Sequence, residues 1–593
     1  MSEYVTNKKR KTLRRLLVFF FHHKGLFFLS LLLAALVNLV QVAKPYILRM
    51  IIDYNLAIGL NDMSKIGLWA VIYLGVTLAG VTMDYSQALV LSSLGQRIMH
   101  TLRTRLFAHI QRMNMQFFDR NSSGSLLTRV NSDIESLSDL YSGIVVAFIK
   151  DILLIGNIMG AMILLNVELA LWSFLCIPVV AVLTFAYRYF ARRNFIRLKA
   201  QLSRLNGFLA ENINGMRIVQ IFAREKEKNA EFGKLGKEYY RLGMVEIILN
   251  SLSNPLLNAL SHLFAALLLM FFAPRTILGG LEIGTLYAFV LYIKQFFNPV
   301  SNLADQFTSI QSSLISADRV FDIIDKEDSL EDLDEGEPIS AFSGRIEFKN
   351  VWFAYVDENW VLKDISFTIE PGQNVAFVGA TGSGKSTIIS LLARFYEIQK
   401  GEILIDGKDI RQYKKSDLRR CISVVQQDVF LFTGDINYNI RLNDQTITDA
   451  DIVQAAKTVG AHPFIKSLPG GYTSYVAERG AEFSAGQRQL VAFARAIAVK
   501  PSVLILDEAT ASIDTETEQA LSQAMKAVSD QITTITVAHR LSTIVHCDQI
   551  FVLDHGTLIE RGTHDELLAF NDHYANLYRL SLAAQEEEKW AAK

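Results

Sequence analysis

Cysteine is scarce in this chain of 593 residues, which has three: Cys176, Cys421 and Cys547. They lie far apart and show no metal-ligand spacing, so the sequence indicates neither a disulfide framework nor a zinc site. Excess charge is also absent, because 59 Lys and Arg residues balance 60 Asp and Glu residues. The basic residues form no groove-like run, and nucleic acid is therefore not an expected partner.

A cleavable signal is missing as well. The N-terminus is basic, with Lys8 to Lys11 followed by Arg14 and Arg15, but no small-residue cleavage site follows the first apolar run. We expect a cytoplasmic basic segment that leads into an interfacial helix, and not a removed leader.

Hydrophobic residues, by contrast, make up 50% of the chain, and the mean hydropathy is positive. The apolar excess lies before about residue 310, in windows long enough to cross a bilayer core of ~30 Å with ~20 residues each. Six windows stand out, near residues 25–50, 66–90, 140–165, 168–188, 247–273 and 277–302. The chain is therefore expected to be an integral membrane protein whose remaining residues form a soluble domain.

Arginine and lysine concentrate in two long segments between the windows, residues 90–140 and 190–245, while the short loops carry few. By the positive-inside rule, both termini and both long segments are cytoplasmic. The long segments are helical in pattern, so spans two to five are expected to continue into the cytosol as helices. At 1.5 Å per residue, ~25 extra residues reach ~35 Å, which can place the turns around Phe118 and Asn214 against a soluble domain. A solvated turn with a helix cap is the alternative for each.

Ionisable residues fall in or near the windows, and charges at membrane depth normally face a bundle interior or a wet cavity. Asp84 and Asp151 are our candidates for a substrate cavity, although snorkelling to the interface explains such residues equally well. Pro45, Pro255 and Pro299 can kink spans one, five and six, or they are tolerated packing kinks.

The domain boundary is predicted in an acidic stretch with Gly and Pro, residues 326–343. Residues 1–325 form the membrane domain, with the interfacial helix and two cytoplasmic coupling loops. From Gly344, short β-rich runs alternate with helical ones, as in an α/β nucleotide-binding core with a β subdomain in front. We assign residues 344–580 to this domain and residues 581–593 to a tail.

A phosphate-binding motif lies between the apolar run 374–378 and the helical run 388–393, and it fits GxxxxGK[ST] at every fixed position. Its backbone N–H groups and the following helix N-terminus can surround nucleotide phosphates. Lys385 then reaches the β- and γ-phosphates, and Ser386 puts its hydroxyl on Mg²⁺. The candidate nucleotide-binding residues are Gly379, Thr381, Gly382, Ser383, Gly384, Lys385, Ser386 and Thr387.

A second phosphate-chemistry motif ends the apolar run 503–507 with two carboxylates. Asp507 can face Mg²⁺, directly or through water, and Glu508 can activate the water that attacks the γ-phosphate. A buried strand that ends in acidic residues is ambiguous by itself, but the upstream phosphate-binding loop favours catalysis.

The run Phe483-Ser484-Ala485-Gly486-Gln487 is similar to the LSGGQ signature of ABC transporters. With six spans before one nucleotide-binding domain, the chain resembles an ABC exporter half-transporter over nearly its whole length. The resemblance implies that Ser484, Ala485, Gly486 and Gln487 contact an ATP held by a second subunit.

The same resemblance implies four further roles in the nucleotide site. Tyr355 would stack on adenine, and Gln427 would sense Mg²⁺ and the attacking water while facing the coupling helices. Asp514 resembles the aspartate that communicates across the dimer, and His539 the histidine that contacts the γ-phosphate.

Glu478 and Arg479 are similar to an exporter-specific loop that meets the coupling helices. Together with the turns that contain Phe118 and Asn214, this match favours an exporter over an importer.

The signature departs from its consensus, because Ala485 replaces a glycine and Phe483 a leucine. An added Cβ where backbone meets phosphate should weaken that contact. Since Glu508 and His539 are present, the chain resembles the catalytically competent half of a heterodimeric exporter. A homodimer with two active sites is the alternative.

We therefore expect an ATPase that uses ATP and Mg²⁺ to export amphipathic multidrug-like molecules or lipids by alternating access. By family analogy it lies in a bacterial inner or plasma membrane, with its N-terminus and ATPase domain in the cytoplasm. The alternatives are a homodimeric lipid flippase, and an ATP-gated channel or regulatory subunit on the same scaffold. Glu508 argues against the last, since gating without a cycle needs no catalytic base.

Overall fold

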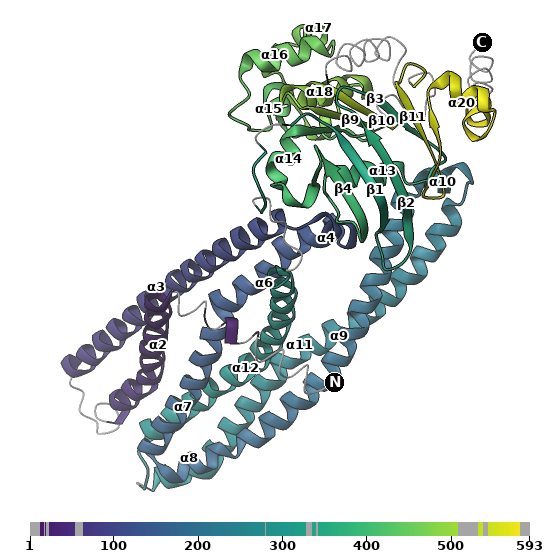
Figure 1. The fold of residues 1–593 in the computed structure, drawn as a ribbon. Helices are drawn as coiled ribbons and strands as arrows, with labels where there is room; N and C mark the ends of the chain where they lie inside the picture. The colour runs from purple at the N-terminus through teal and green to yellow at the C-terminus, as the bar shows by residue number, and fades with distance from the viewer. Residues whose placement is uncertain are drawn as a thin grey trace. The chain divides into compact units, whose positions relative to one another are not determined.

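The computed structural model describes residues 12, 14–16, 18, 23–53, 63–278, 280–327, 335–339, 342–507, 532–537 and 544–580. The chain divides into two compact units, drawn in Figure 1. The first comprises Met1–Gln111 and Asn121–Glu327, and the second comprises Arg112–Arg120 and Asp328–Lys593. The short segment Arg112–Arg120 thus belongs with the C-terminal unit, although its neighbours in sequence belong to the first.

The described part of the first unit is helical. Its elements are α2 (Lys24–Ile51), α3 (Met63–Gln111), α5 (Ser123–Thr128), the π-helical turn η2 (Arg129–Asp133), α6 (Ile134–Asp139), the π-helical turn η3 (Leu140–Ile144), α7 (Val145–Leu165), α8 (Val167–Phe174), α9 (Cys176–Asn214), α10 (Met216–Ile221), α11 (Glu225–Ile277) and α12 (Ile283–Ile324).

Five helical runs among the described residues are long and apolar enough to cross a membrane. They are Lys24–Ile51, Ile66–Gln111, Ser123–Leu165, Val167–Asn214 and Glu225–Ile277. The sixth predicted window lies on α12, whose apolar run is interrupted by Lys294, Gln295 and Asn298. The membrane-spanning helical bundle expected from the sequence is therefore present.

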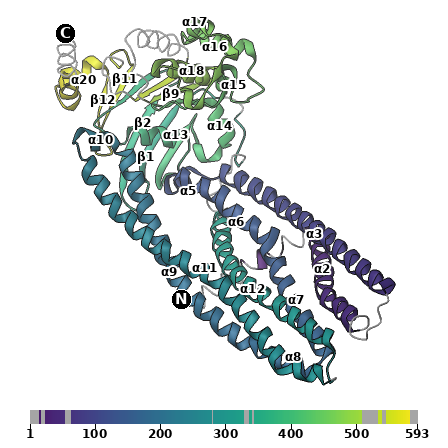
Figure 2. The same ribbon diagram turned by 180° about the vertical axis from the view of Figure 1, so that it is seen from behind.

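The predicted extension of the spans beyond the bilayer core is confirmed by the length of the long helices. Helix α3 has 49 residues and α11 has 53, so at 1.5 Å per residue each is about 75 Å long, against a bilayer core of ~30 Å. Figure 2 shows α9 and α11 running side by side as continuous rods. Pro255 and Pro274 are accommodated inside α11, and Pro299 inside α12.

Aromatic side chains of α12 form the centre of the bundle core. Phe289, Tyr292 and Phe297 are almost fully buried against residues such as Ile158 of α7. The Tyr292 hydroxyl donates to the Val42 carbonyl of α2 over 2.8 Å, which joins the first and sixth helices where water cannot satisfy polar groups.

The second unit contains α4 (Met115–Arg120) and the α/β domain. Its strands are β1 (Ile346–Ala354), β2 (Trp360–Ile369), β3 (Asn374–Val378), β4 (Lys400–Ile405), β5 (Lys408–Asp409), β6 (Ile422–Val425), β7 (Gly434–Asp435), β8 (Tyr475–Val476), β9 (Val503–Asp507), β10 (Thr533–Val537), β11 (Gln549–Asp554) and β12 (Thr557–Gly562). Its further helices are α13 (Lys385–Leu392), α14 (Lys415–Cys421), α15 (Ile436–Arg441), α16 (Asp449–Thr458), α17 (His462–Ser467), α18 (Ala485–Ala498) and α20 (His564–Phe570).

Two main sheets build this unit. One is antiparallel, in the order β2-β1-β4-β5, and corresponds to the β subdomain expected in front of the core. The other has the order β12-β11-β3-β10-β9-β6 and is parallel except at β12. The inner strands are buried on both faces, which explains continuous apolar runs such as Val503–Leu506.

A column of phenylalanines connects the two sheets. Phe348 and Phe367 of the antiparallel sheet stack with ring centroids 4.4 Å apart, and Phe367 also lies 5.2 Å from Phe377 and 5.1 Å from Phe551 of the parallel sheet. All four rings are nearly inaccessible to solvent. Their packing holds the antiparallel sheet against the strand that leads into the phosphate-binding loop.

The substitution Phe367→Ala tests the contribution of this column. It should lower the unfolding free energy of the second unit by about 3–5 kcal/mol, because it removes a buried ring and leaves a cavity between the sheets. Urea unfolding of the purified chain, followed by tryptophan fluorescence, measures the change. Phe570→Ala, at a ring that is 71% exposed, is the matched control. Equal effects of the two substitutions would contradict a stabilising role for the column.

Candidate ATP-binding site

The phosphate-binding loop leaves the carboxyl end of β3, and its glycines are required by the backbone. Gly379 has φ +150°, and a Cβ there would lie 2.1 Å from the Leu553 carbonyl oxygen. Gly384, which directly precedes α13, has φ +106°, and a Cβ there would lie 2.6 Å from the Leu362 side chain. Both conformations favour glycine strongly. The loop therefore passes close to neighbouring residues and leads directly into the N-terminus of α13, which points back into the loop.

The interior of the loop is polar. The Lys385 side chain is buried, and its ammonium donates to the carbonyls of Gly379 and Ala380 over 2.8 and 3.0 Å. Within the described residues, the buried Ser383 hydroxyl has no hydrogen-bond partner. A buried hydroxyl without a partner is costly, and a buried ammonium requires anionic or dipolar neighbours. Both groups fit the phosphates of a nucleotide.

Asp507 lies at the same edge of the parallel sheet as this loop. Strand β10 separates β3 from β9, and Val537 of β10 pairs in register with Phe377 on one side and Asp507 on the other. At ~4.8 Å per strand, the backbones at Phe377 and Asp507 are roughly 10 Å apart. Parallel strands bring their carboxyl ends to one edge, so Asp507 and the first turn of α13 face a common space.

A nucleotide-bound magnesium ion fits this arrangement, because only a few protein oxygen ligands are needed to hold it. Ser386 is exposed on the first turn of α13, and Gln427 is exposed just after β6, the strand beside β9. The part of the chain that the structure describes contains no cluster of three or more His, Cys, Asp or Glu side chains that could hold a metal. Mg²⁺ bound to nucleotide needs none, because it is held by one or two protein oxygens, phosphates and waters.

Tyr355 follows β1 and contacts the start of the phosphate-binding helix. Its hydroxyl lies 3.2 Å from the Thr387 hydroxyl, and its ring packs edge-on against Tyr396, with centroids 5.0 Å apart. Tyr396 belongs to no motif and could not be identified from the sequence alone. The Tyr396 hydroxyl donates over 2.7 Å to Asp119, in the segment Arg112–Arg120. Burial and the Asp119 carboxylate raise the pKa of Tyr396, so this hydroxyl stays protonated and remains a donor.

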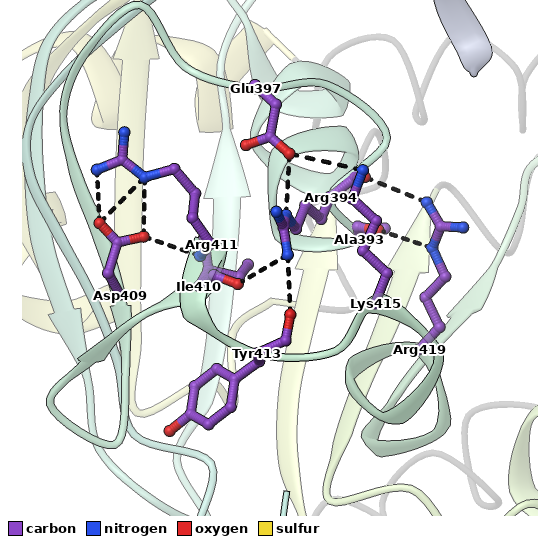
Figure 3. A network of polar contacts seen from close by, with 9 residues as sticks. All are labelled: Ala393, Arg394, Glu397, Asp409, Ile410, Arg411, Tyr413, Lys415 and Arg419. Carbon is purple, nitrogen blue, oxygen red and sulfur yellow. Dashed lines mark hydrogen bonds and ion pairs between the residues drawn. The ribbon is translucent and has the colours of Figure 1, made fainter. Parts of the chain in front are cut away.

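The far end of α13 is held by arginines, as Figure 3 shows. The Arg419 guanidinium donates to the carbonyls of Ala393 and Arg394 over 3.2 and 3.1 Å. The Arg394 side chain pairs with Glu397 over 2.9 Å and donates to the Tyr413 carbonyl over 2.9 Å. The last carbonyls of a helix need such donors. The phosphate-binding helix is therefore fixed to α14 at one end and to the glycine loop at the other.

The signature forms the start of α18. The Ser484 hydroxyl accepts from the Gln487 N–H, and the Gln487 side chain accepts from the Ser484 N–H, each over 3.1 Å. Ser484 and Ala485 are exposed, whereas Gly486 is buried. Phe483 is buried in the core around α15 to α18, with its ring edge-on to Phe464. The bulky first residue of the signature is therefore a core residue of this subdomain.

The coupling candidates lie on both units. Phe118 is partly exposed on α4, beside the buried Phe117, and Asn214 is the exposed last residue of α9. Glu478 and Arg479 are exposed in a tight turn, where Arg479 has φ +58°.

Three predicted residues lie outside the described residues. Glu508 directly follows Asp507, His539 follows β10 by two residues, and Asp514 lies between them in sequence. Their roles stay predictions from the sequence.

The two cavity candidates are engaged with neighbouring helices. Asp84 of α3 accepts from the Lys150 ammonium of α7 over 2.9 Å. Asp151 is buried and accepts from the Gln306 amide of α12 over 2.8 Å. A pocket of about 420 Å³ does lie in the membrane unit, but other residues of α9, α11 and α12 line it.

Comparison with known proteins identifies the family of this chain. Residues 27–300 match the ABC transporter transmembrane region, and residues 362–511 match the ABC transporter family. The chain is 38% identical to the putative ABC transporter ATP-binding protein exp8 of Streptococcus pneumoniae, over 95% of this chain and 96% of that protein. It is 39% identical to the probable multidrug resistance protein YheH of Bacillus subtilis, over 86% and 76% of the two chains.

Two further similarities extend the comparison. The ATP-dependent lipid A-core flippase of Syntrophus aciditrophicus is 35% identical, over 84% of this chain and 82% of that protein. A bacterial Atm1-family ABC exporter solved with ATP bound superposes with a TM-score of 0.77 at 28% identity, covering 96% of this chain and 98% of that chain.

The chain belongs to the ABC transporters. More narrowly, it is an exporter half-transporter of the multidrug and lipid type, which fuses one transmembrane region to one ATPase domain that drives transport.

The substitution Gly384→Ala tests the geometry of the phosphate-binding loop. It should weaken ATP binding about tenfold or more, because a Cβ at φ +106° strains the backbone and meets the Leu362 side chain. Titration with a fluorescent ATP analogue measures the affinity. Gly382→Ala is the matched control, since its φ is also positive but no atom lies within 4 Å of the added Cβ. Adding Leu362→Ala should restore part of the loss. Unchanged affinity in Gly384→Ala would contradict the close approach.

Proposed function

We propose that this chain exports amphipathic small molecules or lipids from a bacterial inner membrane as one half of a dimer, preferentially a heterodimer. The observation that carries the proposal is the division of the ATP site. The phosphate-binding loop holds a buried lysine and, within the part of the chain that the structure describes, a buried hydroxyl without a partner. The signature turn at Ser484 and Ala485 is exposed on a separate subdomain. A second chain is needed to bring a signature to this ATP.

Nucleotide binding is assigned to residues of this chain. Lys385 and the loop N–H groups bind the β- and γ-phosphates, and Tyr355 orients the adenine. Ser386, Asp507 and Gln427 would hold Mg²⁺, which neutralises phosphate charge when bound. Glu508 accepts a proton from the attacking water, and His539 holds the γ-phosphate in place.

Transport follows from the difference in ATP affinity between two states of the dimer. ATP favours the closed dimer because the signature donates hydrogen bonds to the γ-phosphate, and its hydrolysis removes that contact. The turns at Phe118 and Asn214, together with Glu478 and Arg479, transmit closure to the helices. Continuous helices such as α3 and α11 are suited to this, since a rigid rod carries a displacement along its length.

A homodimeric flippase is the second candidate, and one observation favours it. Ala485 is the first residue of α18, is exposed, and has no positive φ. Alanine therefore costs nothing in the backbone, and its effect is limited to one methyl group beside the phosphate.

The two are distinguished by the ATPase activity of the purified chain in lipid, measured alone and after co-expression with any ABC half-transporter whose gene lies beside its own. Turnover that appears only with the neighbour supports the heterodimer. Robust turnover by the chain alone establishes the homodimer.

The substitution Glu508→Gln should reduce ATP turnover at least about 100-fold and leave ATP affinity unchanged, because the amide cannot accept the proton of the attacking water. Phosphate release and nucleotide binding are measured on the same complex. Glu402→Gln, at an exposed position on β4, controls for charge loss. Near wild-type turnover would remove Glu508 from the role of base.

Restoring the consensus glycine by Ala485→Gly tests whether this chain's signature limits turnover of the second ATP, as the heterodimer predicts. In the complex that carries Glu508→Gln, the remaining turnover comes from the ATP beneath this chain's signature. We expect Ala485→Gly to raise that turnover severalfold, because the methyl group no longer separates backbone from phosphate. Ala481→Gly, which lies before the signature, is the control. No increase would show that Ala485 does not limit the second site.

A further inference from the structure

The 420 Å³ pocket among α9, α11 and α12 has the size of a ligand-binding cavity. Leucines from two helices dominate its lining, including Leu183 of α9 and Leu252 and Leu256 of α11. Two of its lining residues are charged, Arg188 of α9 and Asp305 of α12. An apolar cavity with one positive and one negative group differs from an ordinary packing defect, which is apolar throughout.

The membrane spans of the three helices contribute their cytoplasmic ends to this pocket. By the positive-inside topology, the span on α9 leaves the membrane near Arg188, α11 enters it near Leu249, and α12 leaves it near Ser301. Arg192 and Arg193 follow on α9. The pocket therefore lies at the depth of the head groups and first methylenes of the cytoplasmic leaflet.

The two charges form a long ion pair. The Arg188 guanidinium lies 3.4 Å from the Asp305 carboxylate, beyond the 2.7–2.9 Å of a strong charge-assisted hydrogen bond. The Arg188 side chain is 23% exposed and that of Asp305 is 81% exposed. A purely anionic ligand would meet the exposed carboxylate, and a purely cationic one the guanidinium. A ligand with both charges meets an opposite charge at each end.

Polar groups on the pocket wall support a head group at this place. The Tyr187 hydroxyl donates to the Asn250 side chain over 2.7 Å and so joins α9 to α11. One turn before Arg188 on α9, the buried Thr184 hydroxyl has no partner among the described residues. Unsatisfied polar atoms beside a cavity are places where ligand groups or water bind.

We propose that this pocket binds a zwitterionic amphiphile from the cytoplasmic leaflet. Its anionic group lies on Arg188, its ammonium group lies on Asp305, and its tail lies along the leucines of α9 and α11. The net charge of the pocket is zero, which selects a head group of zero net charge. This assignment names the class of cargo and, for its role in export, rests on the proposed function.

The test uses three amphiphiles with the same acyl tail and different head groups: phosphoethanolamine, a phosphate monoester and a primary ammonium. Their binding to the nucleotide-free transporter in lipid nanodiscs is measured by titration. The wild-type protein should bind the phosphoethanolamine amphiphile about tenfold more tightly than either of the others.

Substitutions of the charged pair should shift this preference in opposite directions. Asp305→Asn leaves a positive pocket and should favour the phosphate head group, while Arg188→Gln should favour the ammonium head group. The exchanged pair, Arg188→Asp with Asp305→Arg, should again prefer the zwitterion. Leu252→Trp fills the pocket without altering its charge and should abolish binding of all three.

Two results would overturn the proposal. One is an equal loss of binding affinity for all three amphiphiles in both single variants, because an ion pair that only stabilises the fold would show no head-group preference. The other is unchanged binding in Leu252→Trp, which would place the amphiphile elsewhere. Since no ATP is present, these outcomes are independent of export. Binding with the expected preference but without ATP-dependent transport would instead contradict the proposed function.

Discussion

The phosphate-binding loop is organised around one buried positive charge, the ammonium group of Lys385. The ammonium group of Lys385 lies in the phosphate-binding loop, in contact with backbone carbonyls of the loop itself. Desolvating a charge is expensive, and the carbonyl groups of the loop offset part of that cost. Such a loop is stable only if its surroundings hold it tightly. The aromatic column under β3, the close approach at Gly379 and the arginines behind α13 supply that support. A loop held in one arrangement by such contacts needs little reorganisation to bind phosphates.

Local patterns in the sequence were sufficient for the parts of the fold that depend on neighbouring residues. The loop from Gly379 to Lys385, the buried strand before Asp507 and the long apolar helices follow from periodicity and motif spacing, and the structure has them. The order of the parallel strands and the register that places Asp507 in line with Phe377 required the structure, since they depend on pairing across long separations. The same holds for Tyr396 and Asp119, which lie 277 residues apart. Phe483 shows a different limit: the motif marked it only as a departure from the consensus, whereas its burial shows that it packs in the core of the subdomain.

The candidate sites also differ in how far they could be predicted from the sequence. Residues of the phosphate-binding loop could be assigned from the sequence because one short segment supplies them all. The charges of the membrane unit could not, because a window of hydropathy does not say which face of a helix a carboxylate occupies. Asp84 and Asp151 proved to contact Lys150 and Gln306. Arg188 and Asp305, which share a pocket, come from spans more than a hundred residues apart.

The hydrogen bonds at the start of α18 have a consequence for how the signature can vary. A serine hydroxyl has one hydrogen to donate and two lone pairs to accept. At Ser484 the Gln487 N–H occupies one lone pair, so the hydrogen is still available for a phosphate oxygen. One atom thus begins the helix and recognises the nucleotide. An aspartate could begin the helix equally well but would repel the phosphate, and an alanine could do neither. Threonine shares both abilities of serine, so tolerance at this position is expected to be narrow. Ala485, the first residue of α18, has no polar side-chain atom, so a change there acts on ATP only through the size of its side chain.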